Sequence, residues 1–354
     1  MSDRILLKGN EAIAYGALDA GLNAYFAYPI TPSTETPETL AREYGSAKYP
    51  KFKVFLQTAS ELEAINMTLG AGATGDLAMT ATASPGFSLM QEGISYAAGM
   101  EVPFLIVNVN RGGPGLGNLG VEQSDYLQAT RGGGHGGYKL IVLAPNSVQE
   151  MLSFPSLAFD LAYKYRNPVL ILSDAFLGQL KEDVAPIQNG HDRNYDTSWA
   201  TLGMKNGKRH VLNSLNLEAD PQEKHERHLY QKYLQMGIEV RYESFEIEDA
   251  DIILVSYGIT SRICKSAVKM ARAEGLRVGL FRPITLNPFP YSQLNLLSNN
   301  GKKMLVVELN TGEMVEDVKL AVRGNTQVEQ LNRLGGNVPA LAEIVSKCRE
   351  MIKC

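Results

Sequence analysis

The sequence Tyr-Pro-Ile-Thr-Pro at residues 28–32 places one hydroxyl residue, Thr31, between two prolines at the end of a short apolar strand. Each proline fixes its own φ and drives the preceding residue toward extended geometry. We expect Pro29 and Pro32 to hold Thr31 in a rigid loop before a helix that starts near Ser33. The carboxyl end of a strand is where open α/β sheets bind ligands. An ordinary strand-to-helix turn would give the same local pattern.

The run Ser-Glu-Leu-Glu at residues 60–63 begins a predicted helix with two acids in its first turn. Ser60 and Glu63 have the spacing of a capping box, which gives Glu63 a structural role. Glu61 gains from the helix dipole but is not needed for the cap. Because it follows a strand, we expect Glu61 at the same sheet edge as Thr31, with its carboxylate available for chemistry.

Residues 111–137 are dense in glycine and follow an apolar strand that ends at Asn110. Long loops inside compact domains are usually functional or disordered, so we expect a functional loop at the same edge. Arg111 opens this loop, and a guanidinium matches a carboxylate with two parallel hydrogen bonds. Arg111 is therefore the candidate anion ligand, with a solvated surface charge as the alternative. We interpret His135 as a structural loop histidine.

Residues 70–75 form a literal Gly-x-Gly-x-x-Gly, the pattern of dinucleotide-binding turns. In such sites the pattern follows a strand and opens a helix. Here the helix capped by Ser60 places the glycines at its end, which indicates helix termination and close packing. A nicotinamide-dependent dehydrogenase stays as an alternative hypothesis.

Apolar strands alternate with helices as far as about residue 175. The expected helices are 11–22, 33–44, 60–73, 86–100 and 148–165, and the expected strands are 24–27, 52–57, 77–83, 103–110, 140–143 and 168–173. Near-continuous apolar strands separated by helices predict an α/β fold with a doubly wound, mostly parallel sheet covered on both faces.

The periodic pattern is lost between residues 185 and 208 and then resumes. A charged helix is expected at 220–235, followed by strands 252–255, 277–281 and 304–308 and a helix at 261–274. We therefore expect a first domain over residues 1–190, a connector over 191–245 and a second, smaller α/β domain over 246–354.

The chain has 354 residues, of which 44% are hydrophobic and 20% charged, and its net charge is −4. This composition is typical of a soluble globular protein and argues against a nucleic-acid partner. No apolar run approaches the roughly 20 residues that span a bilayer, and the N-terminus lacks a signal-peptide pattern, so we expect a cytoplasmic protein without a membrane partner. The cysteines, Cys264, Cys348 and Cys354, form no Cys-x-x-Cys pair, so we expect no metal or cluster site built from this chain alone.

Four segments together resemble the α subunit of the 2-oxoacid:ferredoxin oxidoreductases, thiamine diphosphate enzymes of anaerobic metabolism. They are Tyr28-Pro-Ile-Thr-Pro32, Ser60-Glu61 with Ala64-Ile-Asn-Met67, Ala83-Ser-Pro-Gly-Phe-Ser-Leu-Met90, and Arg111-Gly-Gly-Pro114 with Gln123-Ser-Asp125. The resemblance implies a pyrimidine-binding thiamine diphosphate domain, followed by a domain similar to the transketolase C-terminal domain.

The resemblance also implies roles for individual residues. Glu61 matches the glutamate that hydrogen-bonds the aminopyrimidine ring of the cofactor, where acid–base help is worth roughly 10² to 10⁴ in rate. Thr31 and Arg111 match the substrate ligands of the family, the hydroxyl for the 2-oxo or carboxylate oxygen and the guanidinium for the carboxylate. The further cofactor contacts that it implies are Pro29, Ile30, Ser84, Pro85, Gly86 and Phe87.

The Gly-Asp-Gly…Asn element that holds Mg²⁺ and diphosphate is missing, since Gly75-Asp76-Leu77 does not match it. The resemblance assigns the Mg²⁺ and diphosphate site to a β subunit. It assigns [4Fe-4S] clusters to partner subunits, with a γ or ferredoxin-like subunit and ferredoxin taking the electrons. We expect a chain that is inactive alone and shares its active site with the β subunit. A non-catalytic scaffold subunit is the alternative from another class.

The implied reaction is the coenzyme A-dependent oxidative decarboxylation of a 2-oxoacid to acyl-CoA and CO2. Residues 87–93 and 132–138 resemble most the branched-chain subunits that use 2-oxoisovalerate, and 2-oxoglutarate is the alternative substrate. A 2-oxoglutarate site should need a second cation, for which Arg131 or the partner subunit is the candidate.

Overall fold

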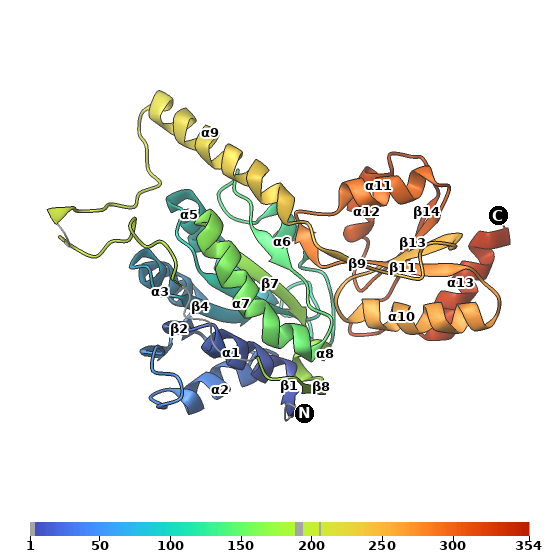
Figure 1. Ribbon diagram of the computed structural model, residues 1–354, viewed down its shortest axis with the longest axis horizontal. Coiled ribbons are helices and arrows are strands. Elements are labelled where there is room, and N and C mark those ends of the chain that lie inside the picture. Colours follow the sequence, from blue (N-terminus) through green and yellow to red (C-terminus); the bar gives the residue numbers. More distant parts are fainter. Residues whose placement is uncertain (1–3, 188–193, 205–206, 354) are drawn as a thin grey trace.

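The computed structural model describes residues 4–187, 194–204 and 207–353, arranged around two separate β-sheets (Figure 1). The first sheet belongs mostly to the blue-to-green part of the chain, and the second to the orange and red part. Helix α9 (Ala219–Met236) runs from the outer end of the first part to the junction between the two. The expected domain boundary at residue 190 and Cys354 lie outside the described residues.

The larger sheet has the strand order β12-β6-β7-β5-β4-β2-β3. Its strands are β2 (Ala24–Ala27), β3 (Val54–Gln57), β4 (Ala78–Ala83), β5 (Leu105–Asn110), β6 (Ile141–Leu143), β7 (Val169–Asp174) and β12 (Thr285–Asn287). All pair in parallel except β12, which is antiparallel to β6. The expected mostly parallel sheet is confirmed, and its parallel strands end at one common edge.

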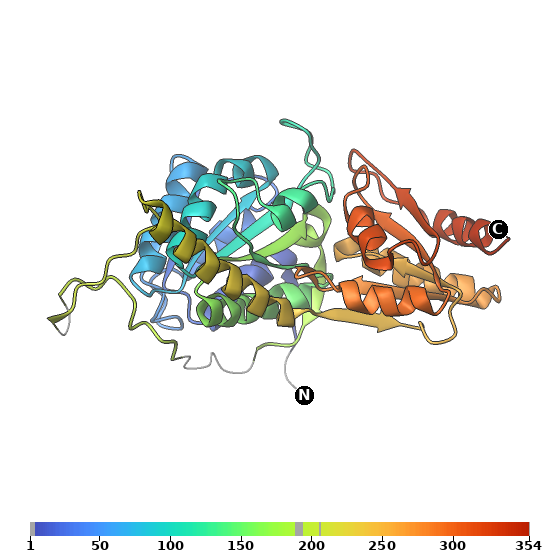
Figure 2. The same ribbon diagram turned by 90° about the horizontal axis from the view of Figure 1, so that it is seen from above.

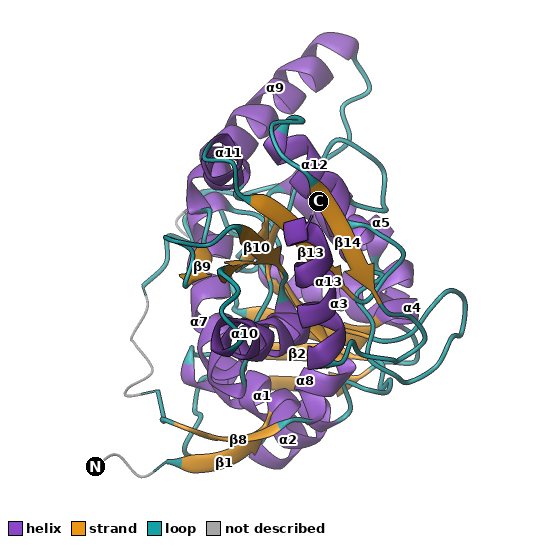
Figure 3. Ribbon diagram, turned by 90° about the vertical axis from the view of Figure 1, so that its right-hand side faces the viewer, coloured by secondary structure: helices purple, strands orange, loops and turns teal. Residues whose placement is uncertain are grey.

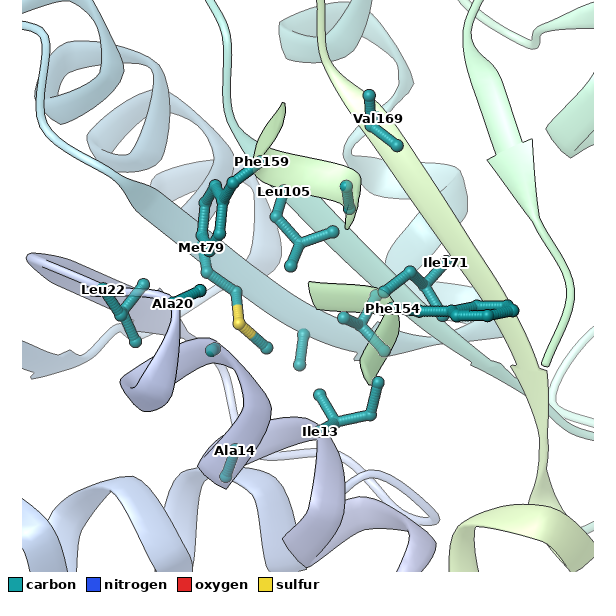
Figure 4. Packing of buried hydrophobic residues seen from close by; sticks show 14 of the residues in the cluster. Ile13, Ala14, Ala20, Leu22, Met79, Leu105, Phe154, Phe159, Val169 and Ile171 are labelled. Atoms are coloured by element: carbon teal, nitrogen blue, oxygen red, sulfur yellow. The ribbon is translucent and has the colours of Figure 1, made fainter. Parts of the chain in front are cut away.

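Helices cover both faces of this sheet because alternate strand residues point to opposite sides. The helices are α1 (Gly9–Asp19), α2 (Glu35–Glu43), α3 (Glu61–Ala73), α4 (Ser84–Leu89), α5 (Gln91–Met100), α6 (Tyr126–Arg131), α7 (Val148–Tyr165) and α8 (Ala175–Gln179). Met79 and Leu105 pack against Ile13 of α1 and Phe159 of α7 (Figure 4), and the next residue along, Ile106, faces the α3 and α5 side.

Several local features differ from the sequence prediction, among them the unpredicted short helices α6 and α8. The single helix expected at 86–100 is two helices, α4 and α5, which meet at Met90. The strands β1 (Ile5–Lys8) and β8 (Lys181–Val184) were not predicted, and they form an antiparallel pair apart from the large sheet (Figure 3). Both strands are short and partly exposed, so neither carries the apolar pattern of the buried strands.

The second sheet has the order β14-β13-β10-β11-β9. Its elements are β9 (Tyr242–Phe245), β10 (Ile252–Val255), β11 (Val278–Pro283), β13 (Lys303–Glu308), β14 (Val328–Asn332), α10 (Gly258–Ala273), α11 (Tyr291–Asn299), α12 (Met314–Val322) and α13 (Leu341–Lys353). Strand β9 comes from the expected connector, whereas β12 leaves the C-terminal part of the chain to join the first sheet. The chain therefore crosses between the sheets more than once.

Buried polar contacts join the two parts of the molecule. Arg282 at the end of β11 is 1% exposed, and its Nη1 donates to Glu150 Oε1 of α7 at 2.9 Å. Gln123 Nε2 donates to the carbonyl of Tyr257 at 3.1 Å, and Gln123 Oε1 accepts from the N–H of Leu309 at 3.1 Å. These contacts fix the second part against α7 and against the loop that follows β5. Among the helices in the described ranges, none has the length and apolar character to cross a membrane.

Candidate active site at the carboxyl edge of the large sheet

The Thr31 loop follows β2 and is fixed by hydrogen bonds from Ser33 and Asn10. The N–H and Oγ of Ser33 both donate to the carbonyl of Ile30, at 3.0 and 2.8 Å. Asn10 of α1, fully buried, donates from Nδ2 to the carbonyl of Pro32 at 2.6 Å. The Thr31–Pro32 peptide bond is cis, and Thr31 itself is exposed. The loop is thus a fixed turn that presents Thr31 at the sheet edge.

Asn10 also contacts the next helix, because its Nδ2 lies 2.8 Å from Glu35 Oε2. Burial raises the pKa of Glu35, but hydrogen bonds from Lys8, Asn10 and Gln179 outweigh burial and lower it overall. Sequence reasoning missed Asn10, although an amide on the apolar face of a predicted helix is a signal for a buried polar contact.

Glu61 is the first residue of α3 and has a different environment from Glu63. Ser60 Oγ accepts from the N–H of Glu63 at 3.2 Å, as the capping box predicts. Glu63 Oε2 accepts from the N–H of Ala59 at 2.9 Å, one residue before the cap, so Glu63 still has a structural role at the helix start. The Glu61 side chain is buried, with 5% exposure. Within the part of the chain that the structure describes, its carboxylate has neither a hydrogen-bond nor an ion-pair partner.

The first turn of α4 lies directly against Glu61. A Cβ added at Gly86 would lie 2.4 Å from Glu61 Oε1 and 2.2 Å from Thr82 Oγ1, so glycine is required for this close approach. Ser84 and Pro85 are half-buried at the same end of the helix. Phe87 was expected to contact the cofactor, but its side chain is fully buried in the core beneath the site.

Arg111 follows β5 and reaches the Thr31 loop. Its Nη1 donates to the carbonyl of Thr31 at 2.8 Å, and its Nη2 to the carbonyl of Leu116 at 3.3 Å. Ser84 Oγ accepts from the N–H of Arg111 at 3.0 Å. Arg111 is 6% exposed, and among the described residues no carboxylate lies within ion-pair distance of its guanidinium. The charge is buried, fixed by neutral carbonyls and left available to an anion.

A buried carboxyl group, Asp125, lies beside Asn108 of β5 and Ser84 of α4. Asn108 Nδ2 donates to Asp125 Oδ2 at 2.7 Å. Burial raises the pKa of Asp125, although hydrogen bonds from Ser84 and Asn108 act in the opposite direction.

The remaining sequence candidates lie outside this cluster. Helix α3 ends at Ala73 and Gly75 has a φ of +85°, so the Gly-x-Gly-x-x-Gly pattern spans a helix end, as predicted. Arg131 forms an ion pair with Asp317 of α12 and is therefore engaged across the junction, contrary to its candidacy for a distal carboxylate. His135 is exposed, and its carbonyl accepts from Ser95 Oγ at 2.6 Å.

The site is an open edge of the sheet. A cavity of about 1380 Å³ lies elsewhere, between α5, α9 and residues 135–139, and has no lining residue in common with Thr31, Glu61 or Arg111. In the described ranges, no cluster of three His, Cys, Asp or Glu side chains is arranged to hold a metal ion. Cys264 and Cys348 are free thiols buried in the second part of the molecule.

Comparison with known proteins identifies the family. Residues 15–253 match the family model described as "Pyruvate flavodoxin/ferredoxin oxidoreductase, thiamine diP-bdg", and residues 250–344 match "Pyruvate:ferredoxin oxidoreductase core domain II". The chain belongs to the 2-oxoacid:ferredoxin oxidoreductases. As a family member, it is a subunit of an oxidoreductase that acts on 2-oxoacids with thiamine diphosphate.

Other 2-oxoacid:ferredoxin oxidoreductase subunits are similar over nearly the whole chain. "Ketoisovalerate oxidoreductase subunit VorB" of Methanothermobacter marburgensis is 48% identical, covering 98% of this chain and 97% of the relative. "2-oxoglutarate synthase subunit KorA" of the same organism is 36% identical, covering 99% of this chain and 100% of the relative.

Solved structures agree on the fold. The structure of 2-oxoglutarate:ferredoxin oxidoreductase from Magnetococcus marinus has a TM-score of 0.86 and 28% identity, covering 99% of this chain and 66% of that longer one. A split-gene transketolase in an inactive β4 tetramer, with a TM-score of 0.61 and 13% identity, shares the fold.

The residues of this oxidoreductase subunit fit thiamine diphosphate. A buried carboxylate without a partner, Glu61, lies against a backbone segment that cannot carry a Cβ at Gly86. Such a carboxyl group is suited to a hydrogen bond with a ring nitrogen of a flat group that enters at the edge. Enzymes of this family use thiamine diphosphate, Mg²⁺ and iron–sulfur clusters, the last two in partner subunits.

Proposed function

We propose that this chain is the α-type subunit of a coenzyme A-dependent 2-oxoacid:ferredoxin oxidoreductase that prefers branched-chain 2-oxoacids such as 2-oxoisovalerate. One observation carries the proposal. The Arg111 guanidinium contacts the Thr31 loop at the same sheet edge at which Glu61 is buried without a partner in the described chain. An anion site thus adjoins a free carboxyl group, which is what 2-oxoacid decarboxylation with an aminopyrimidine cofactor requires.

The proposed roles follow from the chemistry of the three side chains. Glu61 holds a proton at the aminopyrimidine nitrogen. Arg111 binds the 2-oxoacid carboxylate, and the Thr31 hydroxyl donates to the 2-oxo or carboxylate oxygen. Bound thiamine diphosphate supplies the electron sink for decarboxylation. Arg111 increases the rate only as far as it orients the leaving carboxylate, because equal binding of ground state and transition state does not raise kcat.

We assign the cofactor's pyrimidine end to the backbone and side chains around the Thr31 loop and the start of α4, namely Pro29, Ile30, Ser84, Pro85 and Gly86, with Phe87 beneath them. The corresponding division is a pyrimidine-binding domain over residues 1–190, a connector over 191–245 and a transketolase C-terminal-like domain over 246–354. The matched ranges, 15–253 and 250–344, support two successive units.

A β subunit would complete the site by holding Mg²⁺ and the diphosphate. Apolar side chains on α3 and α4 are open to solvent: Leu62 is 46% exposed, Met67 39% and Leu89 56%. Such a patch beside a half-site is suited to a protein partner. In the proposed complex, [4Fe-4S] clusters of a γ or ferredoxin-like subunit pass the electrons to ferredoxin, and the assembly is cytoplasmic.

The substrate preference rests on two observations. The ketoisovalerate relative is 48% identical and the 2-oxoglutarate relative 36%. In addition, Arg131, the cation considered for a distal carboxylate, is paired with Asp317. 2-Oxoglutarate is the second candidate, because the similar Magnetococcus marinus structure is of a 2-oxoglutarate:ferredoxin oxidoreductase with 2-oxoglutarate bound.

The native complex, co-purified through a tag on this chain, tests the proposal in a panel of 2-oxoacids with coenzyme A and a viologen dye. We expect the highest kcat/KM with 2-oxoisovalerate and no activity from the chain alone. A preference for 2-oxoglutarate would overturn the substrate assignment. If none of the 2-oxoacids in the panel supported dye reduction by the complex, the proposed function would be overturned.

A further inference from the structure

Residues 111–120, here called the Arg111 loop, set the position of the substrate-binding guanidinium. Arg111 Nη2 donates to the carbonyl of Leu116 within that loop at 3.3 Å. The loop closes on itself through Gly112 N–H to the carbonyl of Gly120 and Asn118 N–H to the carbonyl of Gly112, both at 3.0 Å. Any shift of the loop therefore moves one of the two carbonyls that hold the arginine.

The loop has little packing of its own. Leu116 and Leu119 are 81% and 57% exposed, and glycines make up much of the remainder. Glycine loses more conformational freedom on ordering than other residues, so such a loop needs contacts from outside to keep one conformation. In Figure 2 the teal loop after β5 rises beside a red loop of the second part of the molecule.

Glu122 supplies the main outside contact. It is 4% exposed, and its Oε2 accepts from the N–H of Gly113 at 3.0 Å and from Ser124 Oγ at 2.9 Å. Its Oε1 accepts from the N–H of Gly335 at 2.7 Å, in the turn that follows β14. One buried carboxylate thus joins the Arg111 loop to the second sheet.

A second contact uses the same turn. Asn118 Nδ2 donates to the carbonyl of Gly335 at 3.1 Å, so both backbone groups of Gly335 bind this region. The backbone segments at Gly120 and Gly336 also pass closely, because a Cβ added at Gly120 would lie 2.7 Å from Gly336 Cα. Gly335 and Gly336 have φ values of +64° and +88°, which glycine adopts without strain.

We propose that Glu122 is a positioning residue for Arg111, through which the second part of the molecule fixes the substrate-carboxylate site. Among the residues that the structure describes, Glu122 contacts neither the Thr31 loop nor the Arg111 guanidinium. It therefore acts through the Arg111 loop. The inference rests on the proposed function, because it takes Arg111 as the carboxylate ligand.

The variant Glu122→Gln tests this inference in the co-purified complex. The amide offers one acceptor oxygen and one donor group, so either Gly113 or Gly335 faces a donor in place of an acceptor. We expect the KM for 2-oxoisovalerate to rise about tenfold, as for the loss of one good polar contact, while the KM for coenzyme A stays within about twofold. Asn118→Ala removes the hydrogen bond from the exposed Asn118 side chain to Gly335. It should also raise the KM for 2-oxoisovalerate and not that for coenzyme A, by a smaller factor.

Ser124→Ala is the matched control, because it removes a donor to the same carboxylate oxygen but leaves both loop contacts. It should leave both KM values within about twofold. Thermal unfolding and subunit stoichiometry show whether each variant folds and assembles. Unchanged KM for the 2-oxoacid in Glu122→Gln, or an equal rise in both KM values, would overturn the inference. A wild-type complex that oxidises no 2-oxoacid would instead refute the proposed function.

Discussion

The Arg111 guanidinium donates to the backbone carbonyl of Thr31 at 2.8 Å, although the two residues are 80 positions apart in the chain. The contact makes the two proposed substrate ligands one unit. A change in either residue should alter the position of the other, because the carbonyl that fixes the arginine belongs to the peptide unit of the threonine.

Replacing Arg111 by lysine should lower kcat/KM for 2-oxoisovalerate by about 10- to 100-fold. Lysine keeps the charge but lacks the planar fork that binds a carboxylate and two carbonyls at once, and hydrogen bonds to charged groups contribute about 1.5–3 kcal/mol. Steady-state kinetics of the purified complex measure the effect. Arg227→Lys on the exposed face of α9 is the control and should leave kcat/KM unchanged. Equal kinetics for the two variants would contradict the role of Arg111.

Replacing Glu61 by glutamine should lower kcat by roughly 10² to 10⁴, as expected for the loss of acid–base help. Stability should change little, since no described residue bonds to the Glu61 carboxylate. Glu63→Gln, in the same helical turn, is the matched control: it can still accept a hydrogen bond at the cap and should retain kcat. Near wild-type dye reduction by Glu61→Gln would favour the scaffold alternative.

Replacing Asn10 by alanine should destabilise the fold and loosen the Thr31 loop. The variant removes the donor to the carbonyl of Pro32 and to Glu35, and leaving a buried acceptor unpaired costs about 1–3 kcal/mol. Urea denaturation of the isolated chain measures the free energy of unfolding. Asn299→Ala, at an exposed position on α11, serves for comparison. A loss no larger than that of the comparison variant would argue against the anchoring role of Asn10.

The junction between the two sheets should respond to pH through Glu313. Burial raises the pKa of this carboxyl group to about 7, although its Oε2 accepts from the N–H of Leu127 at 2.9 Å. The folded state therefore binds the proton more tightly than the unfolded state, whose carboxyl group has the ordinary value of 4.5. The free energy of unfolding should fall as pH rises from about 4.5 to about 7.

Glu313→Gln replaces the titrating carboxyl group by an amide. The free energy of unfolding should then change less between about pH 4.5 and 7. Urea denaturation at several pH values between 4.5 and 8 gives the slopes. Glu248→Gln, at an exposed position whose charge does not act on Glu313, is the control and should keep the wild-type slope. Parallel profiles for wild type and Glu313→Gln would show that Glu313 does not carry the effect.

The sequence by itself determined the large sheet and the edge on which the site lies. Apolar runs predict the strands and parallel strands end at one edge, so Thr31, Glu61 and Arg111 were expected at the same edge once each was placed after a strand. The capping pattern at Ser60 also separated Glu63 from Glu61 correctly, because a helix cap is a local interaction.

Tertiary structure alone decided which side chains hold those residues in place. Asn10, Glu122 and the Arg131–Asp317 pair connect segments far apart in the chain, and β9 and β12 pair with sheets that their position in the sequence does not indicate. Periodicity and capping describe residues a few positions apart. Contacts across the junction depend instead on how the two packed sheets orient their loops. Local sequence patterns therefore could not predict them.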